Sequence, residues 1–380
     1  MRKARESKGV LAVLAVFALG ACDGAGIEYP EDSWERDGMI FGMPEARVFT
    51  EDYTGPPVVG EYLTMPPSVA TLDYDGNRIH EIRLDTFVQE VEVERGNRFQ
   101  AWTFGGTVPG PVLTVRQGDL VRFTMANRTN EEVVITEPGT ASPFLEQVVD
   151  NPWMAPEAAI FPMAHSMDFH SGTVAADDKW RTIPPGQTIE FEWVANYPGV
   201  FMYHCGTPSV LMHTAMGQYG AVIVLPREGY PDEVDHEFAL VQSEFYLGPR
   251  GEDGLRSYDH QAAVDREPTI VAFNGHRSRH VVEPLEATEG DRVRMYVLNA
   301  GPNEISSFHV IGAVFDKVYP EGNLENVQHG MQTITLGASQ GSVVEFIIPE
   351  AGEYKFVDHT FAHPERGAAG GVIVVAPRLE

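Results

Sequence analysis

Residues 201–205 read Phe201-Met202-Tyr203-His204-Cys205, and a similar pattern returns at residues 356–360 as Phe356-Val357-Asp358-His359-Thr360. The first stretch follows Ile189-Glu190-Phe191, and the second follows Val344-Glu345-Phe346 at the same spacing. Similarity within one chain at a fixed offset indicates a duplicated structural unit.

The repeat extends toward the N-terminus of each copy. The run Gly118-Asp119-Leu120-Val121-Arg122-Phe123 returns as Gly290-Asp291-Arg292-Val293-Arg294-Met295. Between such runs, Gly, Pro, Asn and Asp separate short β-branched and aromatic segments, a pattern that is typical of all-β sandwiches. We therefore expect an all-β fold of two tandem Greek-key β-sandwich domains, at residues 81–228 and 229–380.

The N-terminus has the pattern of a bacterial lipoprotein signal. A basic start precedes an apolar stretch that is too short to span a bilayer and ends Leu19-Gly20-Ala21-Cys22, which resembles a lipobox. We expect residues 1–21 to be removed, and lipidation of Cys22 to anchor the chain to an extracytoplasmic or periplasmic membrane face. An ordinary secretory signal with a chance cysteine is the alternative. Residues 22–80, rich in Pro, Gly and acidic residues, are expected to form a tether, part of which can pack on the folded body.

The chain is strongly acidic. Its 27 Lys and Arg residues and 55 Asp and Glu residues give a formal net charge of −28. Nucleic acid is therefore excluded as a partner, because its recognition needs a basic surface. An acidic surface can instead steer a basic redox partner, or it can serve solubility in a salty habitat.

Cys205 is the only cysteine that the folded part of the chain can have, since Cys22 ends the leader. It therefore has no partner for an internal disulfide, and it is either a small buried hydrophobe or a functional thiolate. Two His and one Cys with a weak axial ligand form a blue-copper electron-transfer site. The nearby His204 and His213 favour that second interpretation.

Strand alternation divides the candidate ligands into two groups. In an extended chain, His165 points to the opposite face from Asp168 and His170, and the adjacent residues His204 and Cys205 also point to opposite faces. One group is therefore His165, Cys205 and His213. The other group is His170 and His204, with Asp168 beside them. Two metal sites joined through a Cys–His dipeptide are the natural inference.

With these residues the chain resembles the copper-containing nitrite reductases, whose fold is two cupredoxin domains. The matching segments are residues 165–170, 204–220, 306–312 and 358–359. The resemblance implies reduction of nitrite to nitric oxide, with one type 1 and one type 2 copper per subunit and a small cytochrome c or cupredoxin as the electron donor.

The resemblance also assigns the metal ligands and the assembly. It implies a type 1 copper at His165, Cys205 and His213, and a type 2 copper at His170 and His204. His359 of a neighbouring subunit is the implied third ligand of the type 2 copper, which makes the enzyme a homotrimer with sites at subunit interfaces.

Three further residues have implied catalytic roles. Asp168 is expected to donate a proton, although it could simply orient His170. His309 is the expected second acid, with a structural histidine as the alternative. Ile311 matches the apolar residue over the type 2 copper, but it could equally be a core residue. A pair of proton donors predicts activity that falls at high pH.

One position departs from the family pattern. The axial Met is expected five residues after His213, where this chain has Gln218, and a Met occurs two residues earlier, at Met216. Because Gln is a known axial ligand, we expect Gln218 in that role and a lower reduction potential. Met216 in its place, through a loop shift, is the alternative.

Two other functions compete with nitrite reduction. A laccase-like two-domain multicopper oxidase would need more histidines, in His-x-His pairs, than this chain offers, and Gly206 follows Cys205. A non-catalytic copper-binding or electron-transfer lipoprotein on the same fold would fill only the blue site, so copper stoichiometry distinguishes it.

Overall fold

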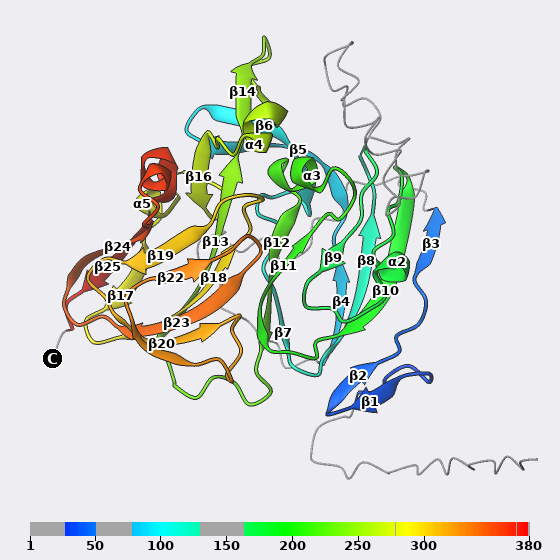
Figure 1. The fold of residues 1–380 in the computed structure, drawn as a ribbon, viewed down its shortest axis with the longest axis horizontal. Helices are drawn as coiled ribbons and strands as arrows, with labels where there is room; N and C mark the ends of the chain where they lie inside the picture. The colour runs from blue at the N-terminus through cyan, green and yellow to red at the C-terminus, as the bar shows by residue number, and fades with distance from the viewer. Residues whose placement is uncertain (1–26, 51–77, 130–162, 278, 370, 379–380) are drawn as a thin grey trace, which may run out of the picture.

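The computed structural model describes residues 27–50, 78–129, 163–277, 279–369 and 371–378. Two β-sandwiches lie side by side, the first in cyan and green and the second in yellow to red (Figure 1). The predicted signal peptide and Cys22 lie outside the described residues.

Two sheets face each other in the first sandwich. Their strand orders are β3-β10-β8-β4 and β7-β12-β11-β9. Their bounds are β3 (Arg47–Thr50), β4 (Ile79–Arg83), β7 (Leu113–Arg116), β8 (Leu120–Ala126), β9 (Asp168–Phe169), β10 (Gln187–Val194), β11 (Gly199–His204) and β12 (Tyr219–Leu225). The inward residues form an aromatic core in which Phe123, Phe169 and Trp193 are at most 1% exposed.

The second sandwich has the same construction. Its sheets run β16-β13-β18-β23-β20-β21 and β17-β25-β24-β19-β22. Their bounds are β13 (His236–Phe245), β16 (Ile270–Phe273), β17 (Leu285–Thr288), β18 (Arg292–Asn299), β19 (Ser306–Val310), β20 (Phe315–Pro320), β21 (Gln328–Met331), β22 (Ile334–Leu336), β23 (Gly341–Ile347), β24 (Gly352–Asp358) and β25 (Gly371–Ala376). Phe308, Phe315 and Phe346 lie in its core.

Strand pairing confirms the duplicated all-β fold. In the first copy β4 pairs parallel with β8, and β8 pairs antiparallel with β10. In the second copy β13 pairs parallel with β18, and β18 pairs antiparallel with β23. The register corrects one detail of the repeat. Arg122 lies opposite Glu192, whereas Arg294, its counterpart, lies opposite Glu345. Glu192, rather than Glu190, is therefore the structural equivalent of Glu345.

A third layer joins the two halves of the chain. The hairpin of β5 (Thr86–Glu94) and β6 (Asn97–Phe104) is continued by β15 (Arg256–Tyr258) and β14 (Leu247–Arg250), which belong to the second half. Arg256 pairs with Phe99 across this junction. One hydrophobic cluster also combines residues of both halves, such as Tyr219 and Tyr296. Contacts therefore cross the predicted boundary between residues 228 and 229.

Part of the stretch that we expected to be a tether is folded onto the first domain. It contains β1 (Trp34–Arg36) and β2 (Met39–Phe41), and β3 forms an edge of the first sheet through pairing with β10. Ile40 and the amide of Asn196 exchange two hydrogen bonds of 2.8 Å. This part of the tether therefore packs on the folded body, because the β-branched and aromatic residues of β3 complete a strand.

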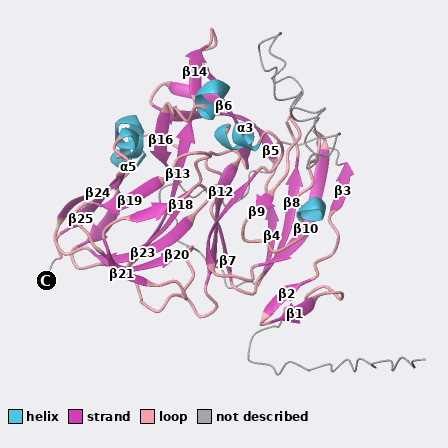
Figure 2. Ribbon diagram, viewed as in Figure 1, coloured by secondary structure: helices cyan, strands magenta, loops and turns pink. Residues whose placement is uncertain are grey.

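Short helical segments lie outside the sheets (Figure 2). They are α2 (Ala176–Lys179), α3 (Val210–Ala215), α4 (His260–Val264), α5 (Arg279–Val282) and the π-helical turn η2 (Pro364–Ala368). None of the helices in the described ranges has the length and apolarity that crossing a bilayer requires.

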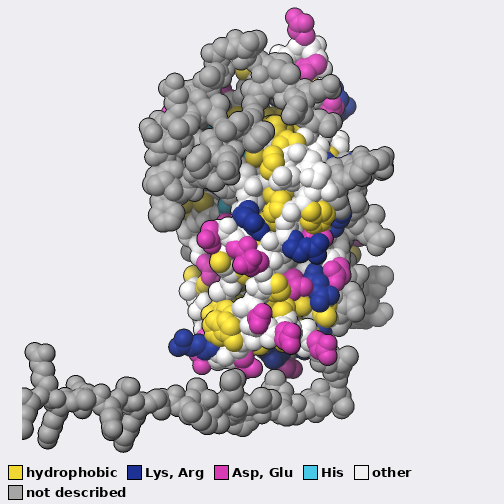
Figure 3. Space-filling view, turned by 90° about the vertical axis from the view of Figure 1, so that its right-hand side faces the viewer, with side chains coloured by type: hydrophobic (Ala, Val, Ile, Leu, Met, Phe, Trp, Pro, Cys, Tyr) yellow, Lys and Arg dark blue, Asp and Glu magenta, His cyan; other side chains and the backbone are white. Residues whose placement is uncertain are grey.

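Acidic and basic side chains are interspersed on the described part of the face in Figure 3. Ion pairs cross the outer side of the first sheet, where Arg122 contacts Glu81 at 3.0 Å and Glu192 at 2.8 Å. Such exposed pairs add little stability, so the hydrophobic cores account for most of the fold's stability.

Candidate metal centres

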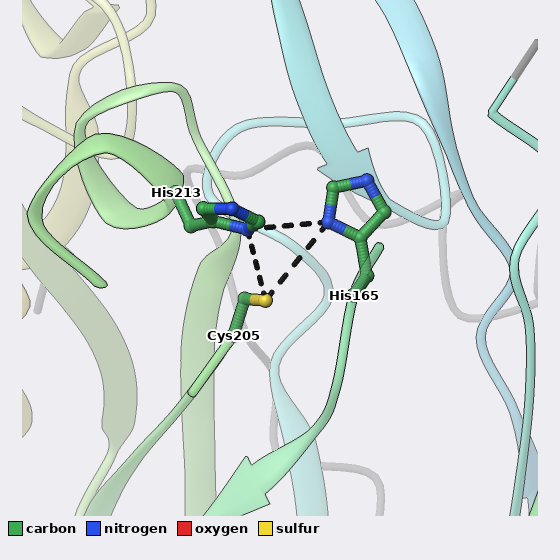
Figure 4. A group of neighbouring side chains, drawn as sticks. All are labelled: His165, Cys205 and His213. Carbon is green, nitrogen blue, oxygen red and sulfur yellow. Dashed lines mark hydrogen bonds between the residues drawn. The ribbon is translucent and has the colours of Figure 1, made fainter. Parts of the chain in front are cut away.

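The first group of ligand atoms is a buried triangle. Cys205 Sγ lies 3.1 Å from His213 Nδ1 and 3.9 Å from His165 Nδ1, and the two nitrogens are 3.2 Å apart (Figure 4). All three residues are at most 1% exposed. One thiolate and two imidazole nitrogens facing one point are the donors that copper prefers, so these residues fit that metal.

Three different elements position this triangle. Cys205 follows the last residue of β11, and its N–H donates to the Gln218 carbonyl. His165 exchanges two backbone hydrogen bonds with Ile183. His213 lies on α3, whose first turn is capped by the Ser209 hydroxyl.

The surroundings favour the thiolate. Burial alone raises the pKa of Cys205, but the adjacent His213 and His165 outweigh burial and hold that pKa well below its usual value. The N–H of Ser166 points to the sulfur at 3.4 Å. Burial lowers the pKa of His165, which keeps its imidazole neutral and able to bind a metal.

Gln218 and Met216 lie in different places. The Gln218 amide oxygen is 3.0 Å from His213 Nδ1, and its amide nitrogen donates to the Thr86 hydroxyl at 2.7 Å. Met216 packs against the hydrophobic cluster that the two halves share. The Gln218 side chain therefore extends its amide oxygen to the triangle. Sequence reasoning missed Thr86, because it is 132 positions away.

The second group consists of Asp168, His170 and His204. The Nε2 atoms of the two histidines are 3.0 Å apart, and Asp168 Oδ2 lies 3.8 Å from His204 Nε2. His170 directly follows β9, while His204 ends β11, and the two strands pair so that His204 lies opposite Asp168. Side-chain alternation thus separates the same two groups that it predicts, although β9 is only two residues long.

This second group also fits a metal. His204 Nδ1 donates to the Cys205 carbonyl at 2.9 Å, which leaves Nε2 with its lone pair free. Partial desolvation by the surrounding protein, with a further contribution from His204, lowers the pKa of the solvent-accessible His170 to about 4, so its imidazole is neutral as well. Burial raises the pKa of Asp168, and its Oδ1 has no hydrogen-bond partner among the described residues.

His309 and His359 form a pair on the second domain. Their ring centroids are 5.1 Å apart, and neither belongs to the two groups above within one chain. The Nδ1–H of His309 donates to the Gln332 carbonyl, which leaves its Nε2 free. Ile311 is 47% exposed and Phe361 73%, so the pair lies on an open apolar surface. The alternative that Ile311 is a core residue was wrong.

Asp358 positions the backbone around this histidine pair, and sequence reasoning missed this role. The buried Asp358 carboxylate accepts from the N–H groups of Ser307 and Thr360, both at 2.9 Å, and contacts His363 at 2.6 Å. These contacts fix the start of β19, which carries His309, and the end of β24, which His359 directly follows. The repeat contained a signal for Asp358, because the equivalent position in the first copy is Tyr203. A carboxylate in place of a buried aromatic residue indicates a specific role.

Known proteins resemble this chain along most of its length. The family model for multicopper oxidases matches residues 87–169. The copper-containing nitrite reductase of Neisseria gonorrhoeae is 34% identical over 368 residues, which cover 94% of this chain and 85% of that protein. That of Cereibacter sphaeroides is 28% identical over 350 residues, which cover 85% of this chain and 84% of the relative.

Solved structures agree with these relatives. Copper nitrite reductase from Nitrosomonas europaea has a TM-score of 0.65 and 34% identity, over 78% of this chain and 94% of that one. A copper-containing nitrite reductase from Thermus scotoductus has a TM-score of 0.64 and 29% identity, over 80% of this chain and 64% of that one. From this similarity, this chain belongs to the copper-containing nitrite reductase family.

Proposed function

We propose that this chain reduces nitrite to nitric oxide and water, with one electron from an external redox protein and two protons. The observation that carries the proposal is that adjacent residues serve two donor groups. His204 belongs to one group and Cys205 to the other, so a single peptide bond joins a site suited to electron transfer to a site suited to binding a ligand.

We assign the type 1 copper to His165, Cys205 and His213. We assign the type 2 copper to His170, His204 and the partner subunit's His359, within a homotrimer. The half-buried His309–His359 pair, beside the exposed Ile311 and Phe361, supports this assembly, because each pair would face the two-histidine group of a second copy. When bound, the first ion supplies one-electron exchange and the second supplies a Lewis acid for nitrite.

Asp168 and His309 are the proposed proton donors. The Oδ1 atom of Asp168 lacks a partner among the described residues and lies beside the histidine pair, so it can hold a proton toward a bound oxyanion. His309 Nε2 is free for the second proton, because Nδ1 is engaged with a backbone carbonyl. Ile311 would restrict the space in which nitrite binds.

Gln218 is the proposed axial ligand of the type 1 copper. Its amide oxygen is directed to His213 Nδ1, whereas Met216 contributes to a hydrophobic cluster. An oxygen donor favours Cu(II) more than a thioether does, so the reduction potential should be lower than that of the Gln218→Met variant.

The partners and the location follow from the same proposal. A small cytochrome c or cupredoxin would supply the electron, steered by the large excess of acidic over basic residues. The leader pattern supports an extracytoplasmic, periplasmic enzyme that lipid at Cys22 anchors to a bacterial membrane. The domain boundaries at residues 81–228 and 229–380 remain part of this proposal.

Oxygen reduction by a laccase-like oxidase is the second candidate, because the matching family model is that of multicopper oxidases. The test is an anaerobic assay of the copper-loaded protein for nitric oxide from nitrite, with the same protein tested for phenol oxidation in air. We expect nitric oxide and poor phenol oxidation. Rapid phenol oxidation without nitric oxide would support the oxidase, and neither activity with one copper per chain would support an electron carrier.

A further inference from the structure

The Gln218 amide is held at both ends. Its oxygen lies 3.0 Å from His213 Nδ1, and its nitrogen donates to Thr86 Oγ1 at 2.7 Å. Gln218 and Thr86 are both 0% exposed, so water does not compete for either contact. The hydrogen bond between them is therefore a fixed part of the site's wall.

The two ends of an amide have different chemistry. The carbonyl oxygen has lone pairs that can bind a cation, whereas the NH₂ group has two donors and no available lone pair. Rotation of the amide by half a turn would present NH₂ to the metal position and abolish the axial interaction. A buried acceptor for the NH₂ group selects the orientation that presents the oxygen.

Thr86 is well placed to be that acceptor. It begins β5, where it pairs with Phe104, and its carbonyl accepts from the Arg128 N–H at 2.8 Å. Its β-branched side chain has few rotamers. The hydroxyl therefore has a fixed position on a sheet, separate from the loop between α3 and β12 that carries Gln218.

The backbone of Gln218 is anchored to the ligands themselves. Its carbonyl accepts from the Cys205 N–H, and its N–H donates to the His213 carbonyl, both at 3.1 Å. Hydrogen bonds to Cys205 and His213 thus fix the backbone of Gln218, and the hydrogen bond to Thr86 fixes the position of its side-chain amide. One residue with no contact to the metal can consequently determine how closely the axial oxygen approaches.

We propose that Thr86 is a positioning residue that orients the Gln218 amide oxygen toward the type 1 copper and thereby sets the reduction potential of that site. The inference rests on the proposed function, because it needs Gln218 as the axial ligand.

The test compares copper-loaded full-length variants: Thr86→Val, which removes the hydroxyl at constant shape, Thr86→Ser, which keeps it, Gln218→Met, and Thr86→Val combined with Gln218→Met. The measurements are the visible charge-transfer spectrum, the copper hyperfine splitting and the reduction potential. We expect Thr86→Val to raise the potential and change the spectrum, and Thr86→Ser to match the wild type. Thr86→Val should have no effect in the Gln218→Met background, since a thioether has no N–H for Thr86 to accept.

Two results would overturn parts of this account separately. An unchanged spectrum in Gln218→Met would refute the axial role of Gln218, and the inference would fall with it. If the reduction potential and spectrum change in Gln218→Met but stay at their wild-type values in Thr86→Val, the role of Thr86 alone is refuted. If Thr86→Val does not fold, Thr86→Ala takes its place in both backgrounds. If Thr86 has a purely structural role, its substitution should lower the melting temperature equally in the wild-type and Gln218→Met backgrounds and leave the reduction potential unchanged.

Discussion

The two sandwiches carry the same histidine pair at the same place. In the first, His170 and His204 follow β9 and end β11, with ring centroids 5.0 Å apart. In the second, His309 and His359 lie on β19 and directly after β24, with centroids 5.1 Å apart. Strand pairing makes these pairs equivalent, since Phe169 lies opposite Tyr203 and Phe308 opposite Asp358.

The difference lies in the residues around the pairs. The first copy has Cys205 where the second has Thr360, and Asp168 where the second has Ser307. At these positions, the thiolate of Cys205 and the carboxylate of Asp168 therefore belong to the first copy alone. A duplicated scaffold can thus acquire two separate roles, because a few substitutions at strand ends change the chemistry while the backbone stays the same.

Exchange of the thiolate should have the largest effect. Cys205→Ser replaces the thiolate with a hydroxyl, so we expect loss of the blue absorption. Nitrite turnover should fall by more than the roughly 100-fold that is typical when a residue hydrogen-bonded to a metal ligand is lost. Thr360→Ala, at the equivalent position, should leave both unchanged. Equal losses in the two variants, measured by absorption and turnover, would contradict the division of roles.

Removal of the carboxylate comes next. Asp168→Asn keeps the shape but loses the acid, so turnover should fall by about 10²–10⁴-fold while copper content stays the same. Ser307→Ala, its counterpart in the second copy, should retain wild-type turnover. Steady-state kinetics with copper analysis would check this, and an unchanged rate in Asp168→Asn would exclude it as proton donor.

A third contrast concerns stability. Arg294 and Glu345 form a buried pair at 2.7 Å, with side chains 7% and 0% exposed, whereas Arg122 and Glu192 at 2.8 Å are 42% and 22% exposed. Glu345→Gln removes one of the two carboxylates that contact the buried Arg294 and leaves Glu237 at 2.8 Å, so it should lower the free energy of unfolding by about 1.5–3 kcal/mol. Glu192→Gln should cost less than about 1 kcal/mol. Urea unfolding of both variants measures the difference, and equal costs would refute it.

A fourth prediction concerns a contact that the two copies share. Asp119 contacts His80 at 2.9 Å, and Asp291 contacts His236 at 2.9 Å. In each copy the aspartate directly precedes one strand, and the histidine lies on the parallel strand beside it. Burial raises the pKa of both carboxyls, but their hydrogen bonds outweigh burial and hold each pKa below its ordinary value. Asp119→Asn and Asp291→Asn should each cost about 1–3 kcal/mol.

The pH dependence of this contribution has a definite sign. Because the carboxyl pKa is lower in the folded than in the unfolded chain, both groups stabilise the fold at pH values above the ordinary Asp pKa of 3.8, and the contribution is lost as the pH falls through the lowered pKa values. Urea unfolding from pH 6 to pH 3 should therefore show less acid sensitivity in either variant. Identical acid sensitivity in the wild type and both variants would contradict the assignment.

Local patterns predicted the features that depend on neighbouring residues. The adjacency of His204 and Cys205 with strand alternation separates the two donor groups, and the Gly-Asp-x-Val-Arg repeat predicts the duplicated sandwich. The same repeat could also have predicted that His80 and His236 contact Asp119 and Asp291, which sequence reasoning missed.

Contacts between distant segments could not be predicted in this way. Thr86 meets Gln218 across 132 positions, and β15 meets β6 through Arg256 and Phe99. Such contacts depend on how whole sheets pack, and no periodicity of one segment contains that information. The Asp358 network is similar, since it joins β19, β24 and the turn at His363.

The central claim is that His204 and Cys205, neighbours in the chain, bind different metal ions. Electron paramagnetic resonance of the copper-loaded protein, with copper quantified per chain, tests it most directly. The account predicts two coppers per chain in two equal signals, and loss of only the non-blue signal in His204→Ala. A single copper per chain, or loss of both signals in that variant, would contradict it.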